Sequence, residues 1–152
     1  MKKILFVCHG NICRSPMAEF MFKKMVRDAK REKDFLIESA ATSGEEIGND
    51  MHRGAKEKLT QMGVPFEKRK ARRITPEDYS DFDLLIGMDM ENMYYMQREW
   101  NKDSDDKVKL LLTYAGKDKD IADPWYTGNF DETFDDLKTG LTALLNKLQE
   151  KR

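Results

Sequence analysis

The clearest chemical signal in the sequence is a cysteine and an arginine, Cys8 and Arg14, separated by five residues near the start of the chain. An apolar run at residues 4–7 precedes the cysteine, and Ser15-Pro16 follows the arginine. A buried strand, a short glycine-containing loop and the start of a helix bind anions well, because loop N–H groups and the helix dipole present positive potential. The residues predicted to surround a tetrahedral anion are His9, Gly10, Asn11, Ile12, Cys13, Arg14 and Ser15.

Cys8 is predicted to be a nucleophile. The N–H groups, the helix dipole and Arg14 all favour a thiolate over a thiol, so the sulfur needs no separate base. The planar guanidinium of Arg14 matches two phosphate oxygens and stays close to the charge that develops in the transition state. Ser15 can donate its hydroxyl to the sulfur, and Asn11 can hold the loop while tolerating an unusual backbone conformation. This loop predicts phosphoryl transfer through a phosphocysteine.

Cleavage of a phosphate ester also requires a proton for the leaving oxygen, and Asp123 is the candidate donor. The residue after it, Pro124, favours an extended backbone at the aspartate. Trp125 and Tyr126 come next, outside any helical stripe, and they can wall a pocket for a substrate ring. The alternative is a turn whose aromatic side chains pack on the core. The loop at Cys8 favours the catalytic interpretation.

Hydrophobic patterning predicts the elements that position these residues. Apolar runs indicate strands at residues 4–7, 35–37, 84–88 and 108–112, with an exit loop at residues 39–44. Helices are predicted at residues 16–30, 53–62, from Thr75-Pro76 onward, 92–100 and 130–149, the last one capped by Asn129. This alternation predicts an α/β fold for residues 1–152, as a single-domain doubly wound sheet of four parallel strands with helices on both faces. Ligands bind such sheets beyond the carboxyl ends of the strands.

The composition fits one folded domain, with 152 residues of which 39% are hydrophobic and 36% charged. No apolar run approaches the roughly 20 residues of a membrane span, and the N-terminal run is too short for a signal peptide. We therefore expect a cytoplasmic protein without a membrane partner. The two cysteines give no disulfide framework, and Cys8, His9 and Cys13 lack zinc-finger spacing. No metal or other cofactor is expected.

The one basic tract of the sequence is the basic segment, Lys68-Arg69-Lys70-Ala71-Arg72-Arg73. This run is either a solvated loop or a basic rim that attracts phosphorylated substrates. The net charge of the chain is only −1, and the basic segment has no interleaved aromatic residues. Nucleic acid is therefore not an expected partner.

Together, these motifs resemble the low-molecular-weight protein tyrosine phosphatase family over essentially the whole chain. The matching segments, in the family's order, are residues 8–15, 39–43, 71–72, 88–89 and 123–126. The resemblance implies that Cys8 is the nucleophile, that Arg14 binds phosphate, and that Asp123 first donates a proton and then activates water. It implies a loop network formed by Asn11, Ser15 and Ser39. It also implies a substrate cleft lined by Trp125 and Tyr126, and we expect His9 at its mouth.

The resemblance also sets expectations for ligands and redox chemistry. The implied substrates are proteins and peptides that contain phosphotyrosine, together with small aryl phosphates, and the product is inorganic phosphate. Cys13 resembles the family's second loop cysteine, which can form a reversible disulfide with Cys8 under oxidation.

Two positions depart from the family's pattern. Many members have a histidine shortly before the Ala71-Arg72 pair that completes the loop network, whereas this chain has Lys68-Arg69-Lys70 there. The network is therefore either shorter or uses a different partner. The residue after the nucleophile, often apolar in the family, is His9 here.

Three alternative functions need weighing. The related protein arginine phosphatases carry threonine where Ile12 stands, and the bulkier isoleucine favours an aromatic ester. Thiol-dependent arsenate reductases need further cysteines to relay a disulfide, and only Cys8 and Cys13 exist here. A phosphocysteine carrier, which transfers phosphate rather than hydrolysing it, would lack an acid such as Asp123. Hydrolysis of phosphotyrosine is therefore the leading prediction.

Overall fold

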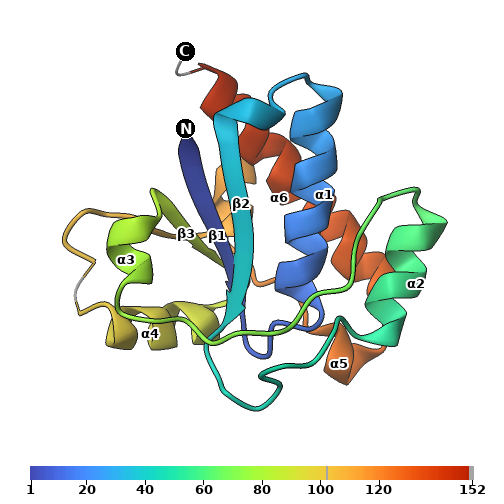
Figure 1. Ribbon diagram of the computed structural model, residues 1–152, viewed down its shortest axis with the longest axis horizontal. Helices are drawn as coiled ribbons and strands as arrows, with labels where there is room; N and C mark the ends of the chain where they lie inside the picture. The colour runs from blue at the N-terminus through green and yellow to red at the C-terminus, as the bar shows by residue number, and fades with distance from the viewer. Residues whose placement is uncertain (102, 151–152) are drawn as a thin grey trace.

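A sheet of four parallel strands lies at the centre of the protein. The structure, a computed structural model, describes residues 1–101 and 103–150. The strands lie in the order β2-β1-β3-β4 (Figure 1). Their bounds are β1 (Lys2–Cys8), β2 (Phe35–Ala41), β3 (Leu84–Gly87) and β4 (Val108–Leu110). The predicted sheet of four parallel strands is confirmed.

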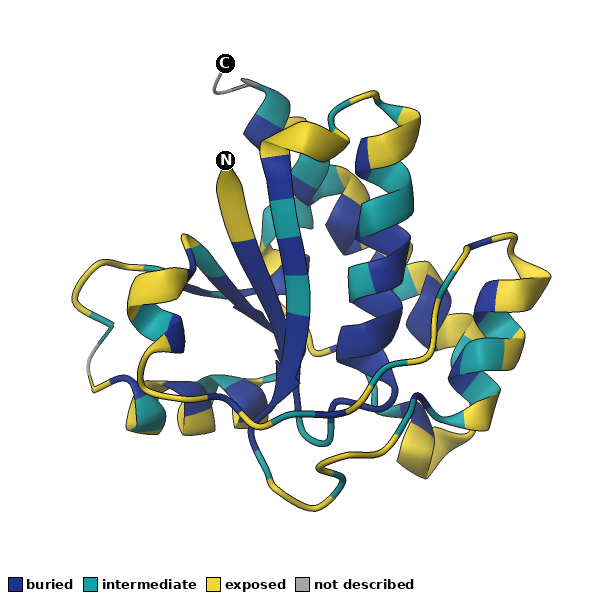
Figure 2. Ribbon diagram, viewed as in Figure 1, coloured by how far each residue is buried: buried dark blue, intermediate teal, exposed yellow. Residues whose placement is uncertain are grey.

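Helices cover both faces of this sheet. Successive side chains of β1 point to opposite faces, and those of residues 4–7 are apolar and buried on both. Ile4 and Phe6 belong to an apolar cluster shared with α1 (Arg14–Asp28) and α6 (Phe130–Glu150). Leu5 and Val7 belong to a second cluster, on the side of α3 (Asp78–Asp81) and α4 (Met90–Glu99). Figure 2 shows β1 buried along most of its length between these layers. The doubly wound arrangement predicted from the sequence is therefore present.

The connection between β2 and β3 contains α2 (Arg53–Gln61) and then a long irregular segment that ends at α3. In Figure 1 this segment crosses the carboxyl end of β2 on its way from α2 to α3. Two backbone hydrogen bonds fix it there, from Ala41 N–H to Arg72 O at 2.7 Å and from Ile74 N–H to Ala41 O at 2.8 Å. The basic segment is thereby joined to the edge of the sheet where ligands are expected.

Several predicted boundaries are wrong. Residues 39–41 belong to β2 rather than to its exit loop, because they continue the pairing with β1 as far as Ala41 opposite Cys8. Leu111 and Leu112 begin a 3-10 helix, η2 (Leu111–Ala115), because β3 ends at Gly87 and offers β4 no further partner. The helix expected from Thr75 begins only at Asp78, whose carboxylate instead accepts the Thr75 N–H at 2.8 Å.

Two short elements were not predicted: a 3-10 helix, η1 (Glu32–Asp34), and a single helical turn, α5 (Pro124–Thr127). The turn α5 starts directly after Asp123, so the segment taken for a loop is helical. Within the part of the chain that the structure describes, no helix has both the length and the apolar character to cross a bilayer.

Candidate active site

The loop between β1 and α1 has the geometry of an anion cradle. Cys8 is the last residue of β1 and Arg14 is the first of α1. The Cys8 sulfur, in a residue only 3% exposed, lies 3.0 Å from the Ser15 hydroxyl and 3.4 Å from the Ser15 N–H. In the described part of the chain, the backbone N–H groups of residues 10–14 donate to no protein acceptor. They are available to an oxyanion held over the sulfur.

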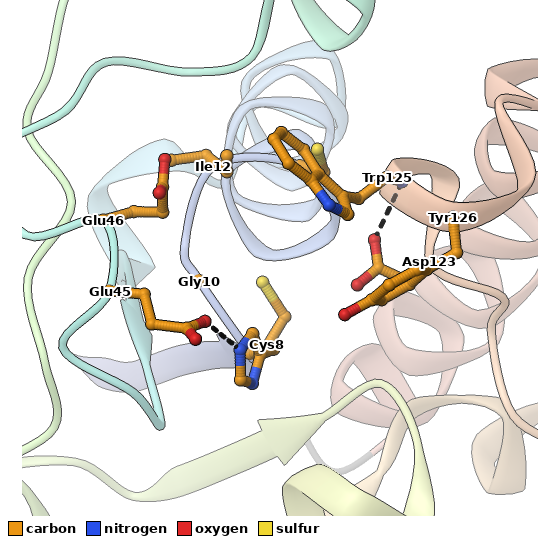
Figure 3. A pocket seen from close by; sticks show the side chains of 10 residues that line it. Cys8, Gly10, Ile12, Glu45, Glu46, Asp123, Trp125 and Tyr126 are labelled. Atoms are coloured by element: carbon orange, nitrogen blue, oxygen red, sulfur yellow. Dashed lines mark hydrogen bonds and ion pairs between the residues drawn. The ribbon is translucent and has the colours of Figure 1, made fainter.

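A cavity of about 350 Å³ opens over this loop. Figure 3 shows the loop on one side of the cavity and Asp123 with its two aromatic neighbours on the other. The lining residues are Cys8, His9, Gly10, Ile12, Cys13, Glu45, Glu46, Asp123, Trp125 and Tyr126. The structure therefore brings the predicted nucleophile, acid and aromatic walls to one cavity.

Arg14 is a buried cation, only 2% exposed, held from two sides. Its Nη1 donates to the Asp89 carboxylate at 2.6 Å and to Ile121 O at 2.9 Å, and its Nη2 lies 3.3 Å from the Asp123 carboxylate. Burial opposes the charge, but the negative groups of Cys8, Asp89 and Asp123 outweigh it and raise the pKa of Arg14 above its ordinary value. Its Nε is buried without a protein acceptor among the described residues, so a donor remains for a bound oxyanion.

Asp123 is positioned by three neighbouring elements. The Ile121 N–H donates to Met88 O, after β3, at 2.9 Å, and the Thr133 hydroxyl of α6 donates to Ala122 O at 3.1 Å. The aspartate has the extended backbone that Pro124 favours, and one carboxylate oxygen accepts the Trp125 N–H at 3.0 Å. The other oxygen faces Arg14. The carboxyl group is 20% exposed, so it lies at the cavity and keeps access to water.

Asn11 is the centre of the predicted loop network. It is fully buried, and its φ of 59° lies in the left-handed region that side chains other than glycine rarely adopt. Its Nδ2 donates to the hydroxyls of Ser15 at 2.8 Å and Ser39 at 2.9 Å. The three residues named from the sequence are thus in contact. Ser39 in turn donates to Glu19 at 2.6 Å.

The sequence left open what replaces the family's network histidine, and the structure places Arg69 there. Its guanidinium donates to both oxygens of Asn11, the backbone carbonyl and the side-chain Oδ1. The network therefore uses a different partner rather than being shorter.

Three residues that contact the loop and its network had no site role predicted from the sequence: Asp89, Glu19 and Arg69. Asp89 follows a buried strand at the same edge of the sheet as Cys8, and that position was an available signal. Arg69 lies in the segment that stands where many family members have the network histidine, so its position was also a signal. Glu19 carried none, because a glutamate in a helix is an ordinary surface residue.

His9 and the aromatic residues form the outer part of the site. The His9 ring lies 2.5 Å from the Glu45 carboxylate and 3.8 Å from that of Glu91, so it faces acidic groups at the cavity mouth. Trp125 and Tyr126 are 57% and 80% exposed. The predicted alternative, in which they pack on the core, is therefore wrong.

The two cysteines, neither of which is in a disulfide, differ in their surroundings. Burial, the charge of Cys8 and that of Asp123 raise the pKa of Cys13 well above its ordinary value, so Cys13 stays a thiol. Cys8 instead faces the Ser15 donors. Among the described residues, no group of three or more histidine, cysteine or acidic side chains is arranged to hold a metal ion.

A parallel α/β sheet with a cysteine, an anion-binding loop and an arginine at its carboxyl edge defines the class of cysteine-dependent phosphatases. The model of the family described as low molecular weight phosphotyrosine protein phosphatase matches residues 3–152. The chain belongs to this family of hydrolases, and the resemblance seen in the sequence is confirmed.

Individual relatives agree with this assignment. The low molecular weight protein-tyrosine-phosphatase YfkJ of Bacillus subtilis is 39% identical over 100% of this chain and 99% of its own. Its crystal structure has a TM-score of 0.96, covering 100% of this chain and 97% of that one. The human low molecular weight phosphotyrosine protein phosphatase is 41% identical over 86% of this chain and 84% of its own. An arginine phosphatase of Drosophila has a TM-score of 0.86 at 28% identity, covering 97% of this chain and 98% of its own.

Asp50 anchors the basic segment beside the loop and gives a testable pH dependence. Burial opposes its charge, but Lys56 and the N–H groups of Met51 and Arg69 outweigh burial and lower its pKa to about 2. Because the pKa is lower in the folded state, the stabilisation is complete above the unfolded pKa near 4 and is lost as the pH falls through about 2.

Replacing Asp50 with asparagine should lower the unfolding free energy by about 1–2 kcal/mol at pH 7, and this loss should shrink as the pH approaches 2. Urea unfolding at pH 7 and pH 3 measures it. Glu57→Gln is the control, because its pair with Arg53 is 65% and 91% exposed and so contributes little. A loss for Asp50→Asn that is the same at both pH values contradicts the assigned ion pair.

Proposed function

We propose that this enzyme hydrolyses phosphotyrosine in proteins and peptides, with Cys8 as nucleophile, Arg14 as phosphate ligand and Asp123 as acid and base. The observation that carries the proposal is the contact of Ser15 with the Cys8 sulfur at 3.0 Å, in a loop whose N–H groups have no acceptor among the described residues. A sulfur in that position is placed to attack a bound phosphoryl group and to leave it again.

In the first step the Cys8 thiolate attacks phosphorus and the bond to the aryl oxygen breaks. The Asp123 carboxyl group gives its proton to that oxygen, so the leaving group departs as a neutral phenol. Arg14 and the N–H groups of residues 10–14 hold the three non-bridging oxygens, where negative charge is distributed in the transition state. A phosphocysteine and a free tyrosine side chain result.

In the second step the Asp123 carboxylate removes a proton from water, whose oxygen attacks the phosphorus of the phosphocysteine. The phosphorus–sulfur bond breaks and Cys8 leaves as a thiolate, while the Ser15 hydroxyl donates to the developing charge. Inorganic phosphate is released. The 20% exposure of the Asp123 carboxylate supports this role, because the same group must also reach solvent.

The outer site supports an aromatic substrate. Trp125 and Tyr126 form one wall of the cavity, and the Trp125 ring is fixed edge-on against His52 with 5.5 Å between centroids. Ile12, which also lines the cavity, is bulkier than the threonine of arginine phosphatases. Because an arginine phosphatase shares the fold, the fold alone does not discriminate between the two substrates.

Rates on matched peptides that carry phosphotyrosine, phosphoserine or phosphoarginine test the substrate. We expect phosphotyrosine to be hydrolysed at least about tenfold faster than the other two, with chelator present throughout, because only its ring can contact the aromatic wall of the cavity. A tenfold preference corresponds to about 1.4 kcal/mol of binding to the transition state. A higher rate on phosphoarginine would assign the chain to the arginine phosphatases instead. Formation of phosphocysteine without release of phosphate would indicate a carrier.

The two cysteines allow a matched test of the nucleophile. Cys8→Ser should abolish turnover of p-nitrophenyl phosphate while inorganic phosphate still binds, because the loop and Arg14 remain. Cys13→Ser should stay measurably active, because the raised pKa of Cys13 keeps it a thiol that takes no part in bond making. Steady-state rates and phosphate titration by calorimetry measure both. Residual turnover in Cys8→Ser that resembles Cys13→Ser would refute the assignment.

Replacing Asp123 with alanine should slow hydrolysis of phosphotyrosine by about 10²–10⁴-fold, the usual contribution of a general acid. The loss in kcat/KM should be smaller for aryl phosphates with acidic phenols, because a good leaving group needs no proton. Rates across a series of substituted phenyl phosphates measure this dependence. An equal loss for every leaving group would mean that Asp123 acts only by holding Arg14.

A further inference from the structure

Arg69 makes an unusual contact with the phosphate loop. One nitrogen, Nη2, donates to two oxygens of the same residue, Asn11 O at 2.7 Å and Asn11 Oδ1 at 2.5 Å. Asn11 is the loop residue with left-handed backbone geometry, and it is fully buried. A single guanidinium therefore hydrogen-bonds both the backbone and the side chain of the loop residue with left-handed geometry.

The backbone of the segment that carries Arg69 is itself held by hydrogen bonds. Its own N–H donates to the Asp50 carboxylate at 3.2 Å, and the neighbouring Ala71 N–H donates to Asn49 O at 2.7 Å. Burial lowers the pKa of Arg69, while the charges of Glu19, Asp50 and Cys8 act in the opposite sense. An arginine nevertheless stays protonated at any physiological pH, so this donor never becomes an acceptor.

The contact sets the direction of every hydrogen bond that follows. Because Asn11 Oδ1 accepts from Arg69 and from the Arg72 N–H, the opposite end of the amide must be the donor. That end, Nδ2, donates to the hydroxyls of Ser15 and Ser39. With its oxygen occupied by Asn11, the Ser15 hydroxyl directs its own hydrogen away from Asn11.

Two acceptors compete for the hydrogen of Ser15, the Cys8 sulfur at 3.0 Å and Ala40 O at 3.4 Å. The sulfur is closer and carries charge as a thiolate, so it receives the bond. Glu19 also favours Asn11 Nδ2 as the donor to the serines. The Ser39 hydroxyl donates its hydrogen to the Glu19 carboxylate at 2.6 Å, so Ser39 can only accept from Asn11.

We propose that Arg69 is a positioning residue for the second step of the reaction, because it orients Asn11 so that Ser15 donates to the departing Cys8 sulfur. This role rests on the proposed function. The bond from Ser15 stabilises a leaving thiolate, so its loss slows breakdown of the phosphocysteine. Formation of the phosphocysteine depends less on it, because there the thiolate is consumed rather than released.

The basic segment supplies a matched control for the test. The Arg73 guanidinium lies four residues along the same segment and pairs with Glu99 at 3.3 Å, away from the loop. Arg69→Met and Arg73→Met therefore remove the same charge and hydrogen-bond donors from neighbouring positions, and only the first removes the contact with Asn11. Arg69→Lys keeps a cation that can still donate to the Asn11 oxygens.

The experiment uses p-nitrophenyl phosphate with the full chain and measures kcat, kcat/KM and the acid-trapped phosphocysteine. Arg69→Met should lower kcat about tenfold to hundredfold, as expected for loss of one charge-assisted hydrogen bond, while kcat/KM changes less than about threefold. KM should fall in parallel, and the phosphocysteine fraction should rise. Arg69→Lys should recover part of kcat, and Arg73→Met should behave as wild type.

An equal fall of kcat and kcat/KM in Arg69→Met would overturn the proposal, as would unchanged kinetics. Circular dichroism shows whether that variant folds. If it does not fold, Asn11→Asp provides the test, because its carboxylate still accepts from Arg69 but can no longer donate to Ser15. We expect the same selective loss of kcat in this variant. Wild-type values of kcat and kcat/KM in Asn11→Asp would refute the proposal. A wild-type enzyme that forms no phosphocysteine would instead refute the proposed function.

Discussion

A buried positive charge constrains the whole site. The guanidinium of Arg14 is 2% exposed, and a charge that has lost its water is tolerated only with close acceptors. Those acceptors come from Asp89, Ile121 and Asp123, which are 75 to 109 residues away in the sequence. The Arg14 guanidinium, which is suited to hold a phosphate, thus also holds the candidate acid Asp123 at the cavity. Phosphate binding and acid catalysis therefore depend on the same contacts of Arg14.

The parallel sheet makes this convergence possible. Since β1 and β3 are neighbours that run in the same direction, the residues after them emerge at one edge (Figure 1). Asp89 uses both of its oxygens there, one to cap α4 through the Asn92 N–H at 2.7 Å and the other to hold Arg14. The helix start and the buried cation therefore stabilise each other, and the rigid end of β3 fixes the Arg14 side chain.

How far the sequence could predict the site depends on whether each signal was local. The strand, loop and helix around Cys8 lie within a short stretch, and Asp123 is followed by its own proline and aromatic residues, so both were recognised. Glu19 acts through Ser39, which lies 20 residues away on β2, and Arg69 acts through Asn11, which lies 58 residues away. No local pattern records such a contact. The same reason explains Leu111, which turns into η2 because its neighbour β3 ends, not because of its own type.

The basic segment shows how composition alone misleads about electrostatics. Read as a run of charge, it suggested either solvated side chains or a rim that attracts phosphate. Two of its arginines have partners in the fold, since Arg69 donates to Asn11 and Arg72 pairs with Asp78 at 3.0 Å, while Lys68, Lys70 and Arg73 are exposed. Two acidic residues, Glu45 and Glu46, line the cavity (Figure 3), and the Glu45 carboxylate contacts the His9 ring. The positive groups that act on Cys8 are the loop N–H groups and the Arg14 guanidinium, whereas the two glutamates place negative charge on the cavity lining. A phosphate on a tyrosine ring lies farther from the peptide backbone than a phosphate on serine, so the ring carries the phosphate to the Cys8 sulfur while the rest of the peptide stays outside the cavity.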